Sequence, residues 1–81
     1  MTDVWFSRPV LVAVGITGDV QNVLGPKQAL ELLDHHWRNA GTPAFLNARH
    51  ACVTAMHGEK PADAAREAFM DAAREARLLA E

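Results

Sequence analysis

The chain has 81 residues, a formal net charge of -2, and hydrophobic residues at 49% of its positions. A chain of this length makes one domain, so we predict a single domain over residues 1–81. The composition excludes a disordered chain, which would be poorer in apolar residues and richer in charge. No run of Lys or Arg is present, which argues against the long-range attraction that draws proteins onto nucleic acid.

The N-terminal residues and the cysteine content predict a cytoplasmic protein without a membrane partner. Residues 1–3 carry no basic side chain, and the apolar run at residues 10–14 is too short for a signal-peptide core or a membrane span. Cys52 is the single cysteine, so no internal disulfide can form. A reducing compartment suits such a chain.

The first predicted elements are the two strands of a β-hairpin. Residues 10–14 are rich in β-branched side chains, follow Pro9, and stop at a glycine. Residues 15–19 then supply two glycines and an aspartate, which is the composition of a turn. Apolar residues resume within the segment 20–24, which predicts a second, short strand.

Three helices are predicted after the hairpin, because a proline stands at each place where a first helical residue is expected. These prolines are Pro26, Pro43 and Pro61, and Gly41 and Gly58 end the first two helices. Thr42 is expected to cap the second helix through its hydroxyl group. Asp63 is expected near the positive end of the third helix dipole. The resulting fold class is α+β, with the order ββααα.

Apolar periodicity predicts which helix faces are buried. The first helix carries one stripe at three- and four-residue steps: Ala29, Leu30, Leu33, Trp37 and Ala40. The second is apolar over a wider arc that includes Leu46 and Met56, so we predict that it is the central and most buried helix. The third has a seam of small residues that lets another helix approach closely: Ala65, Ala68, Phe69, Ala72, Ala73, Ala76 and Leu79.

Histidines and the cysteine are the side chains that could carry catalysis or bind a metal. Glu31 and His35 have the spacing of two ligands on one helix face, but no HExxH or CxxC motif supplies the rest of a site. Cys52 could act with His36, His50 or His57 as its base, yet its apolar surroundings are typical of a core thiol. The glycines of residues 15–18 are too few for a phosphate loop and precede no helix. We predict no enzyme activity, catalytic residue, cofactor or metal.

Charged residues of the third predicted helix form an ordered pattern. Acidic residues recur every four positions at 63, 67, 71 and 75. Asp63 could pair with Arg66, and Asp71 with Arg74. A solvated face is the favoured interpretation, and a docking surface for a basic partner is the alternative.

Other arginines are scattered along the chain. Arg8, Arg38 and Arg49 would make an anion site if the fold brought them together. Arg49 lies among apolar neighbours on the second predicted helix, so it could be partly buried. The pattern leaves open whether Arg49 and Arg66 are structural or functional residues.

The order of motifs along the chain is similar to that of one bacterial family. The motifs are a strand opened by Pro9-Val10, a helix closed by Trp37, the segments 48–52, 65–69 and 72–76, and the stops at Gly41 and Gly58. With this order the chain resembles the domain of unknown function 982 family, which consists of small bacterial proteins. The resemblance implies a small stand-alone protein and brings no assigned activity and no functional residue with it.

The hairpin predicts self-association. The strand at residues 10–14 is apolar on both faces, and three helices from the same chain can cover only one of them. We therefore expect a homodimer, formed either by joining hairpins into a four-stranded sheet or by packing the uncovered face across a two-fold axis.

The predicted function is a non-enzymatic protein-interaction or regulatory module that acts as a homodimer and binds an unknown protein partner. The alternative is nucleic-acid binding through a basic patch that a dimer would assemble from the scattered arginines. A small-molecule enzyme would need a polar pocket that a chain this short scarcely encloses alone. The predicted interaction residues are Arg8, Trp5, Phe6, Leu11, Arg38, Arg49 and Arg66.

Overall fold

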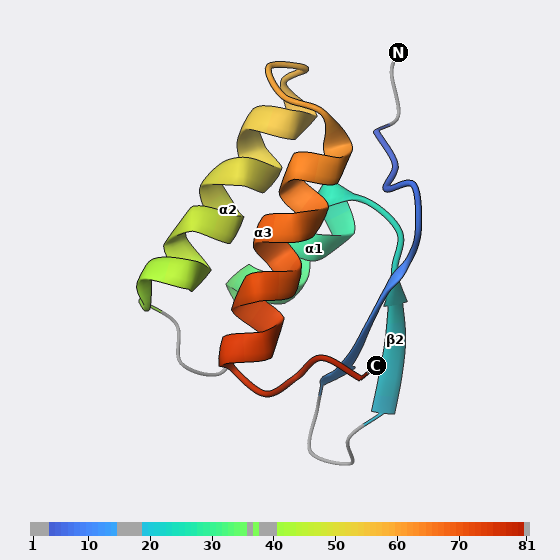
Figure 1. Ribbon diagram of the computed structural model, residues 1–81, viewed down its shortest axis with the longest axis vertical. Coiled ribbons are helices and arrows are strands. Elements are labelled where there is room, and N and C mark those ends of the chain that lie inside the picture. Colours follow the sequence, from blue (N-terminus) through green and yellow to red (C-terminus); the bar gives the residue numbers. More distant parts are fainter. Residues whose placement is uncertain (1–3, 15–18, 36, 38–40, 81) are drawn as a thin grey trace.

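The computed structural model describes residues 4–14, 19–35, 37 and 41–80 (Figure 1). Two strands, β1 (Val10–Val14) and β2 (Asp19–Val23), precede three helices, α1 (Pro26–His35), α2 (Pro43–Met56) and α3 (Ala62–Glu75). The predicted α+β order of a hairpin followed by three helices is confirmed. All three helices lie on one side of the hairpin (Figure 1). No helix in the described part of the chain is long and apolar enough to cross a bilayer.

The hairpin is antiparallel, and the C-terminal residues extend its sheet. Val10 pairs with Val23 at one end of β1 and β2, and Val14 pairs with Asp19 at the other. On the opposite edge of β1, the Ala13 amide donates to the Leu78 carbonyl at 2.7 Å, and the Ala80 amide donates to the Leu11 carbonyl at 2.9 Å. Residues 78–80 therefore cover this edge of β1, so another hairpin could join the described sheet only at the edge of β2.

Helix starts follow the predicted proline pattern closely. α1 and α2 begin at their prolines, and the Phe45 amide donates to the Thr42 hydroxyl oxygen at 3.2 Å. This cap satisfies one of the amides that the first turn of a helix leaves without a partner. α3 differs by one residue, because Pro61 is its N-cap and Ala62 its first helical residue.

The core is centred on α3, not on α2 as predicted. α3 lies between α2 and the hairpin, in front of α1 (Figure 1). Its Phe69 side chain is fully buried, and the alanines of the predicted seam are buried with it, while Leu79, the last residue of that seam, is half-buried and lies beyond the end of α3. On α2, by contrast, Leu46 and Met56 are exposed, because α2 flanks only α3 and α1 and turns one face to solvent.

α1 is shorter than the apolar stripe predicted. It ends at His35, before Trp37. The Trp37 ring still packs on the core, with its centroid 5.3 Å from that of Phe69 at an interplanar angle of 46°. Ala40, the last residue of the predicted stripe, lies outside the described residues. The apolar periodicity therefore predicted that Trp37 packs on the core, but it wrongly predicted that the helix continues to Trp37.

Two helices end in the same hydrogen-bonded motif with different residues. At the end of α2, Gly58 has a φ of +78°, and the next amide, of Glu59, donates to the Thr54 carbonyl at 2.9 Å. At the end of α3, Arg77 takes the same place with a φ of +59°, and the Leu78 amide donates to Ala73 at 2.8 Å. Both ends are Schellman motifs, in which glycine is the favoured residue.

Arg77→Gly is expected to stabilise the protein. A residue with a β-carbon is destabilised by about 1 kcal/mol in the left-handed region of backbone conformation, and glycine is not. Urea denaturation should show a gain of that order in the free energy of unfolding. The converse change at the matched position, Gly58→Arg, should lower it by a similar amount. A loss of stability in Arg77→Gly would mean that the arginine side chain makes a contact that outweighs its backbone strain.

Candidate interaction surfaces

The outer face of the sheet carries apolar side chains that the helices leave uncovered. Side chains alternate along a strand, so Val20, Asn22 and Leu24 point away from the face on which Val23 is buried. Leu11 lies opposite Asn22 in the register, and Ala13 opposite Val20. Both are half-buried. These residues form one continuous surface, which we call the outer face.

Trp5 extends the outer face. The Phe6 amide donates to the Leu24 carbonyl at 2.8 Å, which lays the N-terminal segment beside the end of β2. The Phe6 side chain is buried in the core. Because neighbouring side chains of a paired segment point to opposite sides, we infer that the exposed Trp5 side chain lies on the outer face. Trp5 is 61% exposed, Val20 57% and Leu24 45%. Exposed apolar side chains that gather in this way are typical of an interaction site.

The free edge of β2 is partly closed by side-chain and backbone hydrogen bonds. The side-chain amide of Gln28, on α1, donates through Nε2 to the Asn22 carbonyl at 2.9 Å. Its Oε1 accepts from the Leu24 backbone amide at 3.2 Å. The Leu24 carbonyl is already taken by Phe6. These bonds occupy one end of the edge and shorten the segment with which another strand could pair, which favours packing through the outer face over edge-to-edge joining of two hairpins.

A second surface forms where the N-terminal segment meets α3. The Ser7 amide donates to Asp63 Oδ1 at 3.0 Å, and Arg66 Nε donates to the Arg8 carbonyl at 3.0 Å. Asp63 and Arg66 thus attach the segment to α3 in place of the predicted pair with each other. The predicted pair of Asp71 and Arg74 is present, at 2.9 Å and exposed to solvent.

Asp63 is expected to titrate below the usual range of aspartate. The hydrogen bond from the Ser7 amide lowers the pKa of Asp63, with smaller contributions from the Ser7 side chain and from the charge of Arg66. Folding lowers this pKa, so the contact stabilises the folded protein at any pH above the pKa that Asp63 has in the unfolded chain. The stabilisation is lost as the pH falls through the pKa that Asp63 has in the folded protein.

An NMR titration followed at the side-chain carboxyl carbon of Asp63 measures this pKa directly. Ser7→Ala, which retains the backbone donor, should keep most of the lowering. An Asp63 that titrates at its ordinary value in the folded protein would show that the N-terminal segment is not attached to α3.

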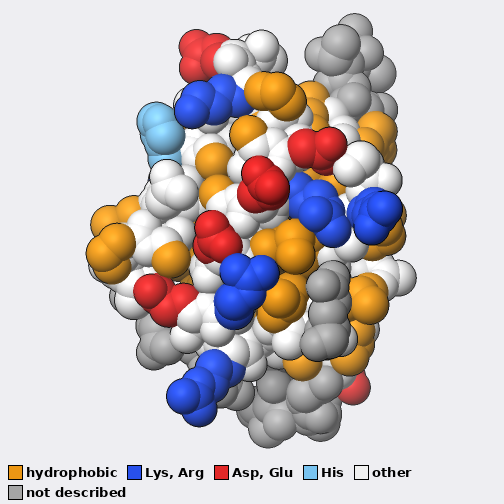
Figure 2. Space-filling model, viewed as in Figure 1, with side chains coloured by type: hydrophobic (Ala, Val, Ile, Leu, Met, Phe, Trp, Pro, Cys, Tyr) orange, Lys and Arg blue, Asp and Glu red, His pale blue; other side chains and the backbone are white. Residues whose placement is uncertain are grey.

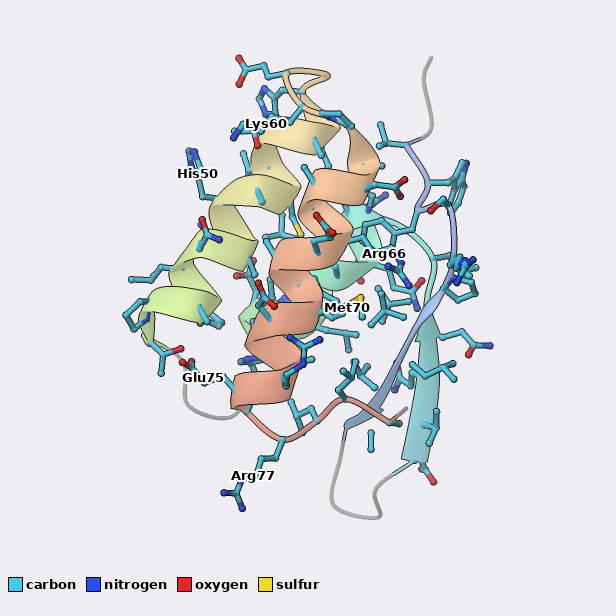
Figure 3. All side chains as sticks on the ribbon, in the orientation of Figure 1. His50, Lys60, Arg66, Met70, Glu75 and Arg77 are labelled. Carbon is cyan, nitrogen blue, oxygen red and sulfur yellow. The ribbon has the colours of Figure 1, made fainter. Side chains whose placement is uncertain are left out.

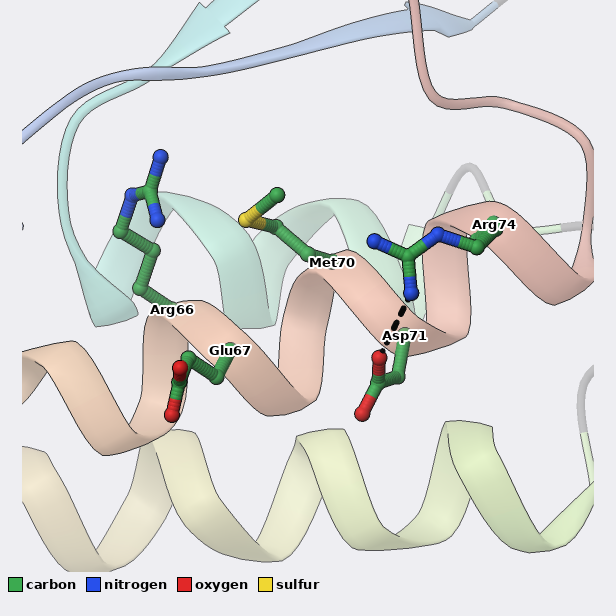
Figure 4. Close-up of a pocket in the computed structure, with 5 residues that line it drawn as sticks. All are labelled: Arg66, Glu67, Met70, Asp71 and Arg74. Atoms are coloured by element: carbon green, nitrogen blue, oxygen red, sulfur yellow. Dashed lines mark hydrogen bonds and ion pairs between the residues drawn. The ribbon is translucent and has the colours of Figure 1, made fainter.

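A groove of about 320 Å³ runs along α3 beside this attachment, lined by Arg66, Glu67, Met70, Asp71 and Arg74. Arg66, Met70 and Arg74 extend toward the sheet, while Glu67 and Asp71 extend toward α2 (Figure 4). In the space-filling view, basic side chains surround an apolar patch in the middle of this face, and acidic ones lie on the α2 side (Figure 2). We call this feature the α3 groove.

The predicted anion site does not assemble from the arginines that the structure describes. Arg49 Nε donates to Asp34 Oδ1 of α1 at 2.9 Å, and the Arg49 side chain is 49% exposed. Arg49 therefore links α2 to α1 at the surface and is less buried than its neighbours suggested. Arg8 lies against α3 instead, and Arg38 lies outside the described residues.

His50 and Cys52 are placed apart from both surfaces, and His36 lies outside the described residues. His50 points away from α3 into solvent (Figure 3). In the described residues, no three His, Cys, Asp or Glu side chains gather as a metal site would require. Cys52 is fully buried, and burial raises the pKa of its thiol to about 12, as a core residue would have it. The segment 15–18, examined as a phosphate loop, lies outside the described residues.

Sequence reasoning named only part of these surfaces. It selected Trp5, Leu11, Arg8 and Arg66, but it placed Phe6 with them, which the structure buries in the core. It missed Met70 as a groove residue. The signal was present in the four-residue steps from Arg66 to Met70 to Arg74, which share one helix face.

Comparison with known proteins identifies the family. The family model described as protein of unknown function (DUF982) matches residues 8–80. The chain belongs to the DUF982 family. The NMR structure of Agrobacterium tumefaciens protein Atu1219 is 30% identical, with a TM-score of 0.80 over 99% of this chain and 79% of that chain. A search of curated proteins found no match. This DUF982 chain thus has a shared fold and no activity assigned through its relatives.

Proposed function

We propose that this DUF982 protein is a non-enzymatic interaction module of the cytoplasm that acts as a homodimer, with the outer face as the dimer interface. The observation that carries the proposal is that Trp5, Val20 and Leu24 are all exposed on the one face of the sheet that no helix covers. A domain of this size has little buried surface to spare, so covering this face stabilises it.

A second copy of the chain is the occupant that fits the outer face. Asn22 lies between Val20 and Leu24 on the outer face, and an amide can both donate to and accept from its own copy across a two-fold axis. With that axis perpendicular to the strands, Trp5 of one copy covers Val20 of the other. The outer face can therefore pack on its own copy through apolar side chains around a central amide.

Val20→Asp is expected to dissociate the dimer. It places a carboxylate under Trp5 of the partner, and burying that unpaired charge should weaken association by about a hundredfold or more. For a Kd of about 1 μM in the natural chain, sedimentation velocity at about 10 μM protein should show mostly dimer for the natural chain and mostly monomer for Val20→Asp.

Leu46→Asp is the matched control. The exposed fraction of Leu46, 55%, is close to that of Val20, but Leu46 lies on α2. It should leave the dimer unchanged. A natural chain that sediments as a monomer at this concentration, or equal effects of the two substitutions, would contradict the proposal.

A further inference from the structure

Arg66, Met70 and Arg74 place two guanidinium groups on either side of an apolar side chain in the α3 groove (Figure 4). They are spaced four residues apart on one helix, so each step along the groove is about 6 Å. Met70 is half-buried and packs against the core, which makes it the floor of the groove.

The guanidinium groups are held in place with donors to spare. Arg66 is half-buried, and its Nε is bound to the Arg8 carbonyl, which leaves its terminal nitrogens without a partner among the described residues. Arg74 uses Nη1 to bind Asp71. Fixed guanidinium groups favour carboxylates, which they can bind through two hydrogen bonds.

An extended peptide matches this spacing. Alternate side chains of a strand point to the same side and lie about 6.7 Å apart, close to the step between the groove residues. Glu67 and Asp71 repel carboxylates from the α2 side and so orient the peptide along the arginines (Figure 4).

We infer that the α3 groove binds an acidic protein segment in extended conformation, with an apolar residue between two acidic residues at alternate positions. The acidic residues bind Arg66 and Arg74, and the apolar residue covers Met70. Nucleic acid fits less well, because the groove residues include no aromatic side chain on which a base could stack. The groove is separate from the outer face, so this inference stands whether or not the chain dimerises.

The test uses a short labelled peptide of glycine and serine that carries Glu, Leu and Glu at alternate positions. Titration into 15N-labelled protein should shift the amides of residues 66–74 and give binding at or below about 1 mM, which is the weak end of specific association. Peptides with Gln in place of both Glu residues, or Ser in place of Leu, should bind more weakly. The same titration on the Val20→Asp monomer should give the same affinity.

Matched arginine variants locate the site. Arg74→Gln and Arg66→Gln should each weaken binding about three- to fivefold, the range expected for partly exposed ion pairs. Arg77→Gln removes the same charge from a side chain that points away from the groove (Figure 3) and should change nothing. The inference is overturned by no binding at about 1 mM, by equal binding of the Gln peptide, by an equal loss in Arg77→Gln, or by tighter binding of a single-stranded oligothymidylate that depends on Arg74.

Discussion

Phe69→Ala is expected to remove most of the stability of the domain. The Phe69 side chain is fully buried on the central helix and contacts the Trp37 ring. Replacing a buried phenylalanine by alanine costs about 3–5 kcal/mol, because the lost burial is added to the cost of the cavity. A small domain has little more than that to lose. Urea denaturation should show a large loss of folded protein already without denaturant.

Phe69→Leu separates the cavity from the ring contact. Leucine fills much of the same space, so this variant should lose only about 1–1.5 kcal/mol. A loss of less than about 1 kcal/mol in the free energy of unfolding of Phe69→Ala would contradict a core centred on α3.

Gly25→Ala is expected to detach the N-terminal segment as well as to destabilise the fold. A β-carbon at Gly25 would lie 2.6 Å from the Val4 carbonyl oxygen and 3.3 Å from the Trp5 ring. Backbone at that distance has to move, at a cost of about 1–3 kcal/mol. The movement should break the hydrogen bond between the Phe6 amide and Leu24, and it should displace Trp5 from the outer face. Hydrogen exchange at the Phe6 amide measures this directly, and sedimentation should show weaker dimerisation.

Gly58→Ala is the control for Gly25→Ala. Gly58 has a positive φ but no atom within 4 Å of an added β-carbon, so its substitution costs about 1 kcal/mol through the backbone alone. Exchange at the Phe6 amide should stay protected. Loss of protection in both variants would indicate general destabilisation and would contradict a specific contact at Gly25.

Local signals in the sequence predicted the elements well. Proline and glycine act on their own backbone, so the starts of α1 and α2 and the cap at Thr42 followed from the residues themselves. The bridge from Leu79 to Val12 could not be predicted in this way, because it is one short pairing between distant parts of the chain. The same is true of the exposed Leu46, since which arc of an apolar helix is buried depends on its neighbours.

The surfaces were predicted only where a single element carries them. The apolar faces of β1 indicated that one face would lack a cover, and the structure places all helices on the other side (Figure 1). The attachment of the N-terminal segment to α3, by contrast, depends on hydrogen bonds from Ser7 and Arg66 across the fold. Spacing along the sequence alone does not show such contacts.

Intermolecular distances test the dimer most directly. In a sample mixed from 13C-labelled and unlabelled chains, isotope-filtered NOE spectra detect only contacts between copies. The two-fold packing proposed for the outer face predicts contacts from the Val20 methyl groups of one copy to the Trp5 ring of the other. Filtered spectra at high concentration that show no contact between copies, or contacts only from residues of α2 and α3, would contradict it.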